Sequence, residues 1–459
     1  MRLTNRLFSE LDVGVSAEIK RLVTTDDLLM FAAVSGNLNP MHIAVEAGHG
    51  DSEPRSVAPG MFLGSLISAV LGTQLPGPGT LYLRQVLEFH ERVHAGDEVV
   101  SRVIVEEKLS QDQVRLSTTI THAETGMLVL SGEAIVQAPT QHVDRSDIDV
   151  PGLVVQRHRH FEALIAQAKT IDALVTAVVC PHDPNSLGGA MLAAEHGLIK
   201  PILIGKPSTI RSLADSLNLD LNGLEVLEAA DDLAASSLAC SLVRQGRSAA
   251  VMKGHLHTDD LLKPMLDKTL GLRTGSRFTH VFVMDVPGQP EPIMVTDAAI
   301  NIAPDLATKV CICQNAIDLA LSLDMEPRVG VLSAVETVNP AIQSSIDAAL
   351  LSKMADRGQI RNGLVEGPLA MDNAVDLGAA RTKGLKGQVA GRANILLVPD
   401  LDAGNMLAKQ LAYISYAEGA GLLLGARVPV ILNSRSDSPI ARLASCAVAS
   451  IHYSQTRSA

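Results

Sequence analysis

The first 140 residues contain several short segments in which apolar and polar positions alternate. In residues 113–122, for example, Val114, Leu116, Thr118 and Ile120 alternate with polar neighbours. A two-residue period with many β-branched side chains is typical of a strand that is buried on one face. Together with shorter apolar runs, this pattern predicts four strands: Tyr82–Phe89, Glu98–Glu106, Gln113–His122 and Met127–Gln137.

Two apolar segments in the same part are long enough to form helices. Thr24 or Thr25 can cap the first, and the acidic residues that follow suit the positive end of a helix dipole. The second, Gly60–Leu71, is rich in small apolar residues, as expected of a buried helix. Helices packed on an antiparallel sheet predict an α+β domain over residues 1–140. The mostly polar residues 141–152 are interpreted as a linker.

From residue 153 to residue 459 the pattern changes to continuous apolar runs separated by helical stretches. Such runs are typical of strands buried on both faces, as parallel strands in α/β sheets are. A segment of this length is large for one core, so we expect an α/β/α fold of two subdomains, the second at roughly 276–427. The runs are Val175–Cys180, Ile202–Gly205, 281–286, 329–334, 394–400, 421–425 and 428–432.

The composition excludes several classes of protein. There are 38 Lys and Arg against 50 Asp and Glu, which gives a formal charge of −12, and the chain has no Trp, four Tyr and seven Phe. This charge argues against a nucleic-acid partner, and so few aromatic side chains leave little surface for base stacking. Five Cys do not make a disulfide framework, and no apolar run reaches the length of a membrane span. We therefore expect a cytoplasmic enzyme with no nucleic-acid or membrane partner.

The first group of candidate site residues lies between residues 31 and 61. The segment FAAVSGNLNPMHI places a polar loop and His42 directly after a helix, and VAPGMFLGSL places Gly60 at the start of a buried helix. Together with LPGPGTLYLRQVLEFHERVHAGDEV, these features resemble the MaoC-like (R)-specific enoyl-CoA hydratase family of the hot-dog fold. The resemblance covers about the first 140 residues.

This resemblance implies that a loop Asp and a His hold the water that is added to an enoyl-CoA double bond. The matching positions are Asn37 and His42, and the Gly60 N–H matches the donor to the thioester carbonyl. A carboxamide has no basic site near neutral pH, so Asn37 can only orient a water and His42 has to transfer the protons. The position before the glycine, often His in the family, is Pro59. The domain is therefore either a hydratase or a hot-dog domain that has lost its chemistry.

Four sequence blocks in the second part carry another resemblance. In order and spacing they are similar to the phosphate acetyl/butyryltransferase family over roughly residues 155–455. The resemblance implies exchange of an acyl group between CoA and phosphate, with acyl-CoA, CoA, phosphate and acyl phosphate as substrates and no bound cofactor. It also implies a homo-oligomer. The blocks are MLAAEHGLIKPILIGK (191–206), VMKGHLHTDDLLKPML with GLRTG (251–275), VPDLDAGNMLAKQL (398–411) and GARVPVILNSRSDS (425–438).

The last block supplies the candidate catalytic residues. The resemblance carries the family's active-site Ser-Arg pair over to Ser434 and Arg435. Arginine presents a planar fork to phosphate oxygens, and the serine hydroxyl can contact the thiol or the carbonyl. In the acetyl branch an Asp seven residues after the serine is proposed as the base for the CoA thiol, but that position is Ala441 here. Asp437 is near in sequence but at a different position, so the identity of the base stays open.

Three further residues are expected at the ends of predicted strands. Gly404 and Asn405 lie between a predicted strand and a predicted helix, where free backbone N–H groups can bind phosphate. Ser333 opens the loop after another strand and is expected to face the substrate cleft. Ordinary turns are the alternative interpretation of all three.

A cationic segment precedes residue 276. Lys253, Lys263 and Arg273 share it with His255 and His257. The two histidines have a spacing that is compatible with a metal site, but no Cys accompanies them and acyl transfer to phosphate needs no metal. We therefore expect these residues to bind the anionic substrates and expect no metal; a solvated loop is the alternative.

Two other functions fit parts of the sequence. Asn37 and Ala441 stand where the resembled families have acids, so a non-catalytic or regulatory acyl-CoA-binding protein is the main alternative. A metal-dependent dehydrogenase of two domains is a weaker one, because the chain lacks a glycine-rich nucleotide-binding motif and a cluster of metal-binding carboxylates.

Overall fold

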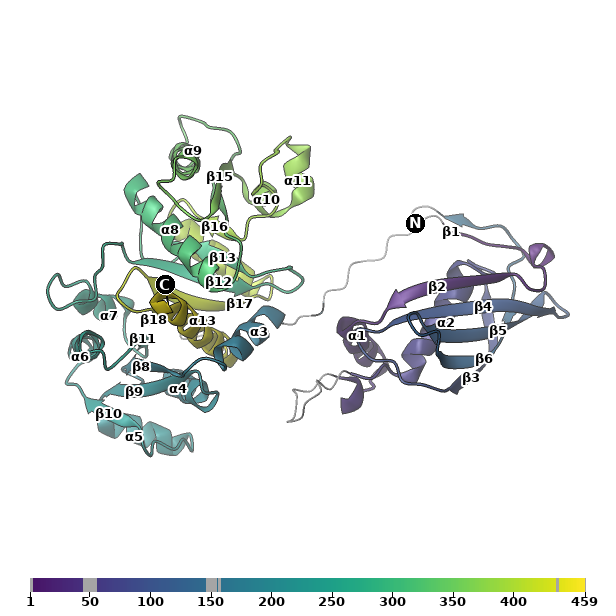
Figure 1. The fold of residues 1–459 in the computed structure, drawn as a ribbon, viewed down its shortest axis with the longest axis horizontal. Helices are drawn as coiled ribbons and strands as arrows, with labels where there is room; N and C mark the ends of the chain where they lie inside the picture. The colour runs from purple at the N-terminus through teal and green to yellow at the C-terminus, as the bar shows by residue number, and fades with distance from the viewer. Residues whose placement is uncertain (1–2, 44–55, 146–154, 156–157, 435–436, 459) are drawn as a thin grey trace. The chain divides into compact units, whose positions relative to one another are not determined.

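The structure is a computed structural model that describes residues 3–43, 56–145, 155, 158–434 and 437–458. The chain divides into two compact units, Met1–Val155 and Gln156–Ala459, which we call unit 1 and unit 2 (Figure 1). Most of the predicted linker lies outside the described residues. In the part that is described, no helix is both long and apolar enough to cross a membrane.

Unit 1 is a five-stranded antiparallel sheet packed against a buried helix. The strand order is β2-β4-β5-β6-β3. The apolar side of α2 (Gly60–Thr73) packs against the sheet, with Phe62, Leu63 and Ile67 in the core. This is the predicted α+β arrangement. The strands are β2 (Ser16–Leu22), β3 (Leu81–Phe89), β4 (Glu98–Lys108), β5 (Gln113–His122) and β6 (Leu128–Gln137).

The first helix of unit 1, α1 (Thr25–Ser35), begins with a capping box. The Thr24 hydroxyl accepts the Asp27 N–H at 3.1 Å, and the Asp27 carboxylate accepts the Thr24 N–H at 3.0 Å. Of the two threonines that the sequence left open, Thr24 is therefore the cap. The other short elements are β1 (Leu3–Thr4), which pairs with β7 (Asp144–Arg145), and the 3-10 helices η1 (Phe8–Glu10) and η2 (Pro40–His42).

Unit 2 is built on one mixed sheet of eleven strands with helices on both faces. The order is β10-β9-β8-β11-β18-β17-β12-β13-β16-β14-β15. The strands are β8 (Leu174–Val179), β9 (Ile199–Gly205), β10 (Glu225–Glu228), β11 (Ala250–Lys253), β12 (Thr279–Asp285), β13 (Ile293–Thr296), β14 (Arg328–Leu332), β15 (Leu364–Leu369), β16 (Ile395–Leu397), β17 (Glu418–Leu424) and β18 (Val430–Ile431).

The prediction that all of these apolar runs form parallel strands is wrong at the centre of the sheet. Strand β12 pairs antiparallel with both β13 and β17, and β17 pairs antiparallel with β18. The outer strands on each side are parallel to their neighbours. A continuous apolar run indicates a strand that is buried on both faces. The central antiparallel strands are buried on both faces just as the parallel strands are, so the run alone does not reveal strand direction.

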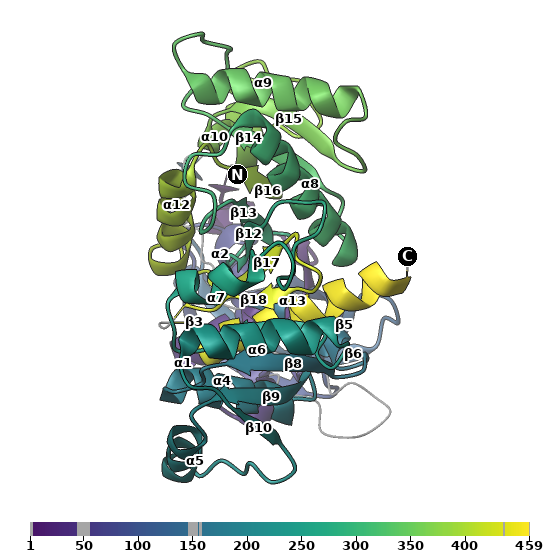
Figure 2. The same cartoon turned by 90° about the vertical axis from the view of Figure 1, so that its left-hand side faces the viewer.

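Eleven helices in the described part of unit 2 cover the two faces of this sheet. Helix α6 packs on α7, β8 and β9, whereas α13 packs on α3, α4, β17 and β18. Figure 2 shows α12 and α8 on opposite sides of β13 and β16. The helices are α3 (Arg159–Ala168), α4 (Pro184–Glu195), α5 (Pro207–Ser216), α6 (Asp232–Arg244), α7 (Thr258–Met265), α8 (Leu306–Ser322), α9 (Gln343–Asp356), α10 (Met371–Val375), α11 (Leu377–Thr382), α12 (Leu401–Tyr413) and α13 (Pro439–Ser458).

Candidate active site

Ser434 lies in the loop that joins β18 to α13, and neighbouring side chains hold this loop in place. The Ser434 N–H donates to the Asp437 carboxylate at 2.7 Å. The Asn433 side chain is buried, with 7% exposed, and donates to the Ser445 hydroxyl at 2.9 Å and to Asp437 at 3.4 Å. The bonds to Asp437 lie within the loop, and the bond to Ser445 joins its start to α13, so together they fix the loop relative to the helix that follows it.

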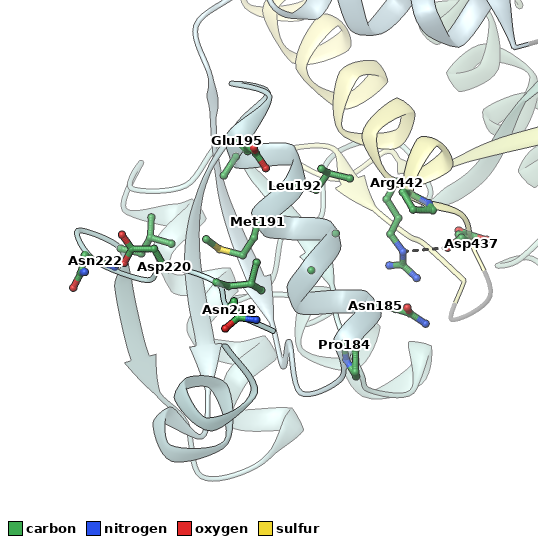
Figure 3. Close-up of a pocket in the computed structure, with 16 residues that line it drawn as sticks. Pro184, Asn185, Met191, Leu192, Glu195, Asn218, Asp220, Asn222, Asp437 and Arg442 are labelled. Carbon is green, nitrogen blue, oxygen red and sulfur yellow. Dashed lines mark hydrogen bonds between the residues drawn. The ribbon is translucent and has the colours of Figure 1, made fainter. Parts of the chain in front are cut away.

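Arg442 is the second support of the Ser434 loop. Its guanidinium donates to the Ser434 carbonyl at 2.8 Å and to the Asp437 carbonyl at 3.3 Å, and only 7% of the residue is exposed. Figure 3 shows the side chain of Arg442 beside α4, with the bond to Asp437 drawn. A Cβ added at Gly189 of α4 would lie 2.6 Å from Arg442 Cδ. The absence of a side chain at Gly189 therefore leaves the space that the Arg442 side chain occupies against α4.

Asp437 has the properties of a proton acceptor. Burial raises the pKa of its carboxyl above the usual range, while hydrogen bonds from Ser434 and Asn433 act in the opposite direction and do not cancel the shift. A carboxylate with a raised pKa is a stronger base toward a thiol than an ordinary aspartate is. The residue lies on the same cavity wall as Ser434. It could therefore take or return a proton at the atom that reacts.

Two cavities meet at Ser434. The first, of about 350 Å³, has Phe282 and Met284 in its wall together with charged residues, and we call it the apolar cavity after these two side chains. The second, of about 470 Å³, also has many apolar side chains in its wall but contains Lys253, and we call it the cationic cavity after this lysine. Ser434 and Phe282 line both. The apolar cavity is also lined by Met284, Asn405, Ala408, Lys409, Ala412, Tyr413, Ala417, Glu418, Gly419, Asp437, Ser438 and Ala441. The cationic cavity is also lined by Leu256, His257, Thr258, His280, Ala299, Leu432 and Asn433.

A larger cavity, of about 610 Å³, borders the same loop at Asp437 and is shown in Figure 3. It reaches Asp437 and Arg442, but its other charged lining residues are Glu195 and Asp220. The Arg442 guanidinium is already occupied by carbonyl groups of the loop. Acidic walls repel phosphate groups, so the cationic cavity, which has no Asp or Glu among the described residues of its wall, fits phosphate better than this larger one does.

In unit 1 the candidate residues are held by contacts of a different kind. His42 Nδ1 lies 2.8 Å from the Val57 carbonyl, three residues before Gly60 opens α2. The Asn37 side-chain oxygen accepts the Asn39 N–H at 3.3 Å, and the backbone N–H of Asn37 donates to the Ser35 hydroxyl at 3.2 Å. Asn37 and Asn39 are both exposed. His42 is therefore bonded to the segment that leads to Gly60, whereas Asn37 uses its amide oxygen within its own turn.

Comparison with known proteins adds relatives of unit 2. Residues 232–450 match the family model described as Phosphate acetyl/butaryl transferase. The phosphate acetyltransferase of Rhizobium meliloti is 53% identical over 300 residues, which are 65% of this chain and 95% of that protein. The chain belongs to the phosphate acetyl/butyryl transferase family. The phosphate butyryltransferase of Clostridium beijerinckii is 39% identical over 294 residues, which are 64% of this chain and 97% of that protein.

Other matches concern the fold of this transferase and its N-terminal unit. The crystal structure of a branched-chain phosphotransacylase from Enterococcus faecalis is 30% identical, with a TM-score of 0.54, and covers 61% of this chain and 99% of that one. Residues 8–127 match the model of the MaoC like domain. The predicted combination of a MaoC-like hot-dog domain with a phosphotransacylase fold is thus confirmed.

The structure brings some of the predicted transferase residues together. Asn405 and Lys253 line the cavities that meet at Ser434. Arg435 lies outside the described residues. The expectation that the Gly404 N–H is free to bind phosphate is wrong: α12 begins at Leu401, and this N–H donates within the helix to the Asp400 carbonyl at 3.1 Å. Gly404 instead lets α12 approach Asp297, whose carbonyl would lie 2.6 Å from an added Cβ.

Other predicted residues are not among those that line these two cavities. Lys263 is exposed near the end of α7, and Arg273 is exposed in a bridge with Ala426. The Ser333 hydroxyl pairs with that of Ser344 at 3.0 Å. Among the described residues there is no cluster of His, Cys, Asp or Glu that could hold a metal ion.

Sequence reasoning missed three groups at the site. Asp437 was noted in the sequence but given no role, whereas Arg442 and His280 were not singled out at all. Asp437 and Arg442 stand three and eight residues after Ser434, so scanning the start of the helix after the Ser-Arg pair for charged residues would have found them. His280 comes from a strand 154 positions earlier than Ser434, and only the fold brings it to the cavity.

Proposed function

We propose that unit 2 transfers an acyl group between CoA and inorganic phosphate, with the reaction taking place at Ser434. The observation that carries this proposal is the position of Ser434 between an apolar cavity and a cationic one. An acyl transferase that uses phosphate needs both environments next to the reacting carbonyl. The 53% identity to a protein described as a phosphate acetyltransferase supports the same reaction.

The two cavities are proposed to bind different substrates. The acyl chain of the thioester enters the apolar cavity, beside Phe282 and Met284, and phosphate enters the cationic cavity, beside Lys253. Arg435 directly follows Ser434 in the sequence and is proposed, from the family resemblance, to bind phosphate oxygens. The Ser434 hydroxyl is proposed to contact the carbonyl or the sulfur of the substrate.

The chemistry is a direct transfer in a ternary complex. A phosphate oxygen attacks the thioester carbonyl, a C–O bond forms, and the C–S bond breaks with its electron pair going to the CoA sulfur. In the reverse direction the CoA thiol has to lose its proton before it attacks the acyl phosphate. Asp437 is proposed to accept this proton, in place of the absent acid at Ala441, and to return it in the forward direction.

A thiol-release assay tests this function. The full chain is incubated with acetyl-, propionyl- or butyryl-CoA, with and without phosphate, and the free CoA thiol is measured. We expect release that requires phosphate and that decreases at least tenfold in Ser434→Ala and Arg435→Ala. Lys353→Ala, a change of an exposed lysine on α9 that lines neither cavity, is the matched control and should behave like the wild type. Absence of phosphate-dependent release with all three substrates would refute the proposal and favour a non-catalytic acyl-CoA-binding protein.

A second function is proposed for unit 1, namely hydration of a trans-enoyl-CoA. The bond between His42 Nδ1 and the Val57 carbonyl supports it, because it fixes the ring and the tautomer in which Nε2 can accept a proton. Hydration of crotonyl-CoA by the wild type that is abolished in His42→Ala would support catalysis in unit 1. Wild-type activity at the uncatalysed rate would indicate a domain that has kept the hot-dog fold without its chemistry.

A further inference from the structure

His280 lies in the wall of the cationic cavity and is fully buried. It stands on β12 opposite Leu423 of β17, and its ring meets that of Phe282 edge to face, with centroids 4.4 Å apart. Among the described residues, none provides a hydrogen-bond partner for Nδ1 or Nε2. Leaving a buried polar atom without a partner costs about 1–3 kcal/mol, so two such nitrogens on one ring call for an explanation, and a ligand that bonds to the ring is one.

One ring nitrogen of His280 lies close to β17, the strand that pairs with β18. A Cβ added at Gly421 would lie 3.3 Å from His280 Nε2 and 2.5 Å from the Leu432 carbonyl, so Nε2 and this carbonyl lie near the same point of β17. Leu432, Ser434 and His280 line the same cavity. Phe282 covers the ring, is only partly buried and lines both cavities. Contact between a ligand and His280 therefore requires the Phe282 side chain to move aside.

The imidazole is neutral at physiological pH. Burial lowers the pKa of His280 well below its usual range, although the nearby Asp297 carboxylate acts in the opposite direction. That carboxylate is itself engaged by the N–H groups of Ala299 and Ile300, each at 3.0 Å, and by the Asn301 side chain. A neutral imidazole carries one N–H donor and one acceptor. It can therefore polarise a carbonyl without bringing a second charge next to the phosphate.

We infer that His280 donates a hydrogen bond to the acyl carbonyl of the substrate while phosphate attacks it. The inference rests on the proposed transfer function and adds a residue to it. As the C–O bond forms, the carbonyl electron pair moves onto the oxygen, and the imidazole N–H stabilises this oxyanion. When the C–S bond breaks, the pair returns to the carbonyl and the thiolate leaves. His280 keeps its proton throughout.

The test compares His280 with His452, a second histidine whose pKa burial lowers, to about 4. His452 Nδ1 has a partner, the Ser322 hydroxyl at 2.8 Å, and His452 lines a different cavity. For His280→Leu in the full chain we expect kcat of phosphate-dependent thiol release to decrease about 10²–10³-fold, with KM for acyl-CoA little changed. Its Tm should stay equal or increase, because an unpartnered polar group is replaced by an apolar one. His452→Leu should show the reverse: a lower Tm and an unchanged kcat.

His280→Gln provides the second variant, because its amide keeps a neutral donor and should recover part of the lost kcat. If the wild type is active and the kcat of His280→Leu is within threefold of the wild-type kcat, the inference is overturned. A lower Tm in His280→Leu, together with no recovery in His280→Gln, would also overturn it, since this is what a structural role predicts. If the wild type itself releases no thiol in response to phosphate, the transfer function fails instead.

Discussion

The two candidate sites differ in how their loops are held. The Ser434 loop is bonded to buried side chains, among them Asn433 and the Arg442 guanidinium, which Gly189 of α4 accommodates. In unit 1 the Asn37 turn is exposed and is held by bonds between residues two positions apart. A loop fixed by buried, charge-assisted bonds keeps its reacting groups in place before the substrate binds. Unit 2 has such a support, whereas unit 1 has kept the fold and His42 but has an amide at the position of the acid.

The largest expected effect concerns Asp437. Asp437→Asn removes the proposed base but keeps its shape, so kcat of phosphate-dependent thiol release should decrease by about 10²–10⁴-fold. Because the folded state raises the pKa of this carboxyl, ionising it costs stability at every pH above its usual pKa, and the neutral variant should unfold at an equal or higher temperature near pH 7. A variant that loses Tm but retains activity would show that Asp437 supports the loop without acting as the base.

In unit 1 the informative substitution adds a carboxylate instead of removing one. Asn37→Asp places a carboxylate where the resembled family has its acid, and we expect hydration of crotonyl-CoA to increase by about 10–100-fold, since a positioned general base typically contributes at least this much. Phosphate-dependent thiol release by unit 2 should be unchanged and serves as the internal control. If hydration does not respond, the turn that engages the Asn37 oxygen holds the side chain away from the water, and the comparison between the two loops becomes sharper.

The support provided by α4 can be tested with two adjacent glycines that line the same cavity. Gly189→Ala places a Cβ against Arg442, so we expect about a tenfold decrease in kcat/KM and a loss of about 1–3 kcal/mol of stability. Gly188→Ala meets no atom within 4 Å and should stabilise α4 by about 0.5–1 kcal/mol with normal activity. Equal behaviour of the two variants in thermal unfolding and kinetics would show that Arg442 is not constrained by α4.

The smallest expected effect is at the cap of α1 in unit 1. Thr24→Ala removes a bond to the Asp27 N–H and should lower the free energy of unfolding of unit 1 by about 1 kcal/mol. Thr25→Ala changes a neighbouring residue that is not the cap and should have less than half this effect. Chemical denaturation followed by a probe in each unit checks the prediction. An equal decrease in the free energy of unfolding of unit 2 would show that the two units do not unfold independently and would contradict the prediction.

The fold was largely predictable because each unit follows a period that the sequence displays. The alternating residues 113–122 form β5 with the predicted bounds, and the apolar segment at Gly60 forms α2. Strand β2 was missed because most of its residues are exposed and only Ala17 and Ile19 are partly buried apolar positions. The direction of β12 and β17 was missed because burial on both faces produces the same run in either direction.

The site was less predictable, because its geometry depends on contacts between distant segments. The Ser434 block and Lys253 could be selected from short motifs, but their meeting at one cavity depends on β11 and β18 being neighbours in the sheet. Gly404 was misjudged because the sequence did not reveal that the helix had already begun at Leu401. No sequence motif around His280 marks it as a site residue, because it was selected for being buried without a hydrogen-bond partner, which only the structure shows.

The central claim, that Ser434 lies between an acyl cavity and a phosphate cavity, is tested most directly by two-substrate kinetics of one variant in each. Ala412→Leu fills part of the apolar cavity, and Lys253→Met removes a charge from the cationic one. We predict that Ala412→Leu raises KM for butyryl-CoA about tenfold relative to acetyl-CoA and leaves KM for phosphate unchanged. Lys253→Met should raise KM for phosphate by a similar factor and leave the acyl preference unchanged. If both variants shift both constants equally, or if neither shifts any, the two cavities do not divide the substrates and the claim is contradicted.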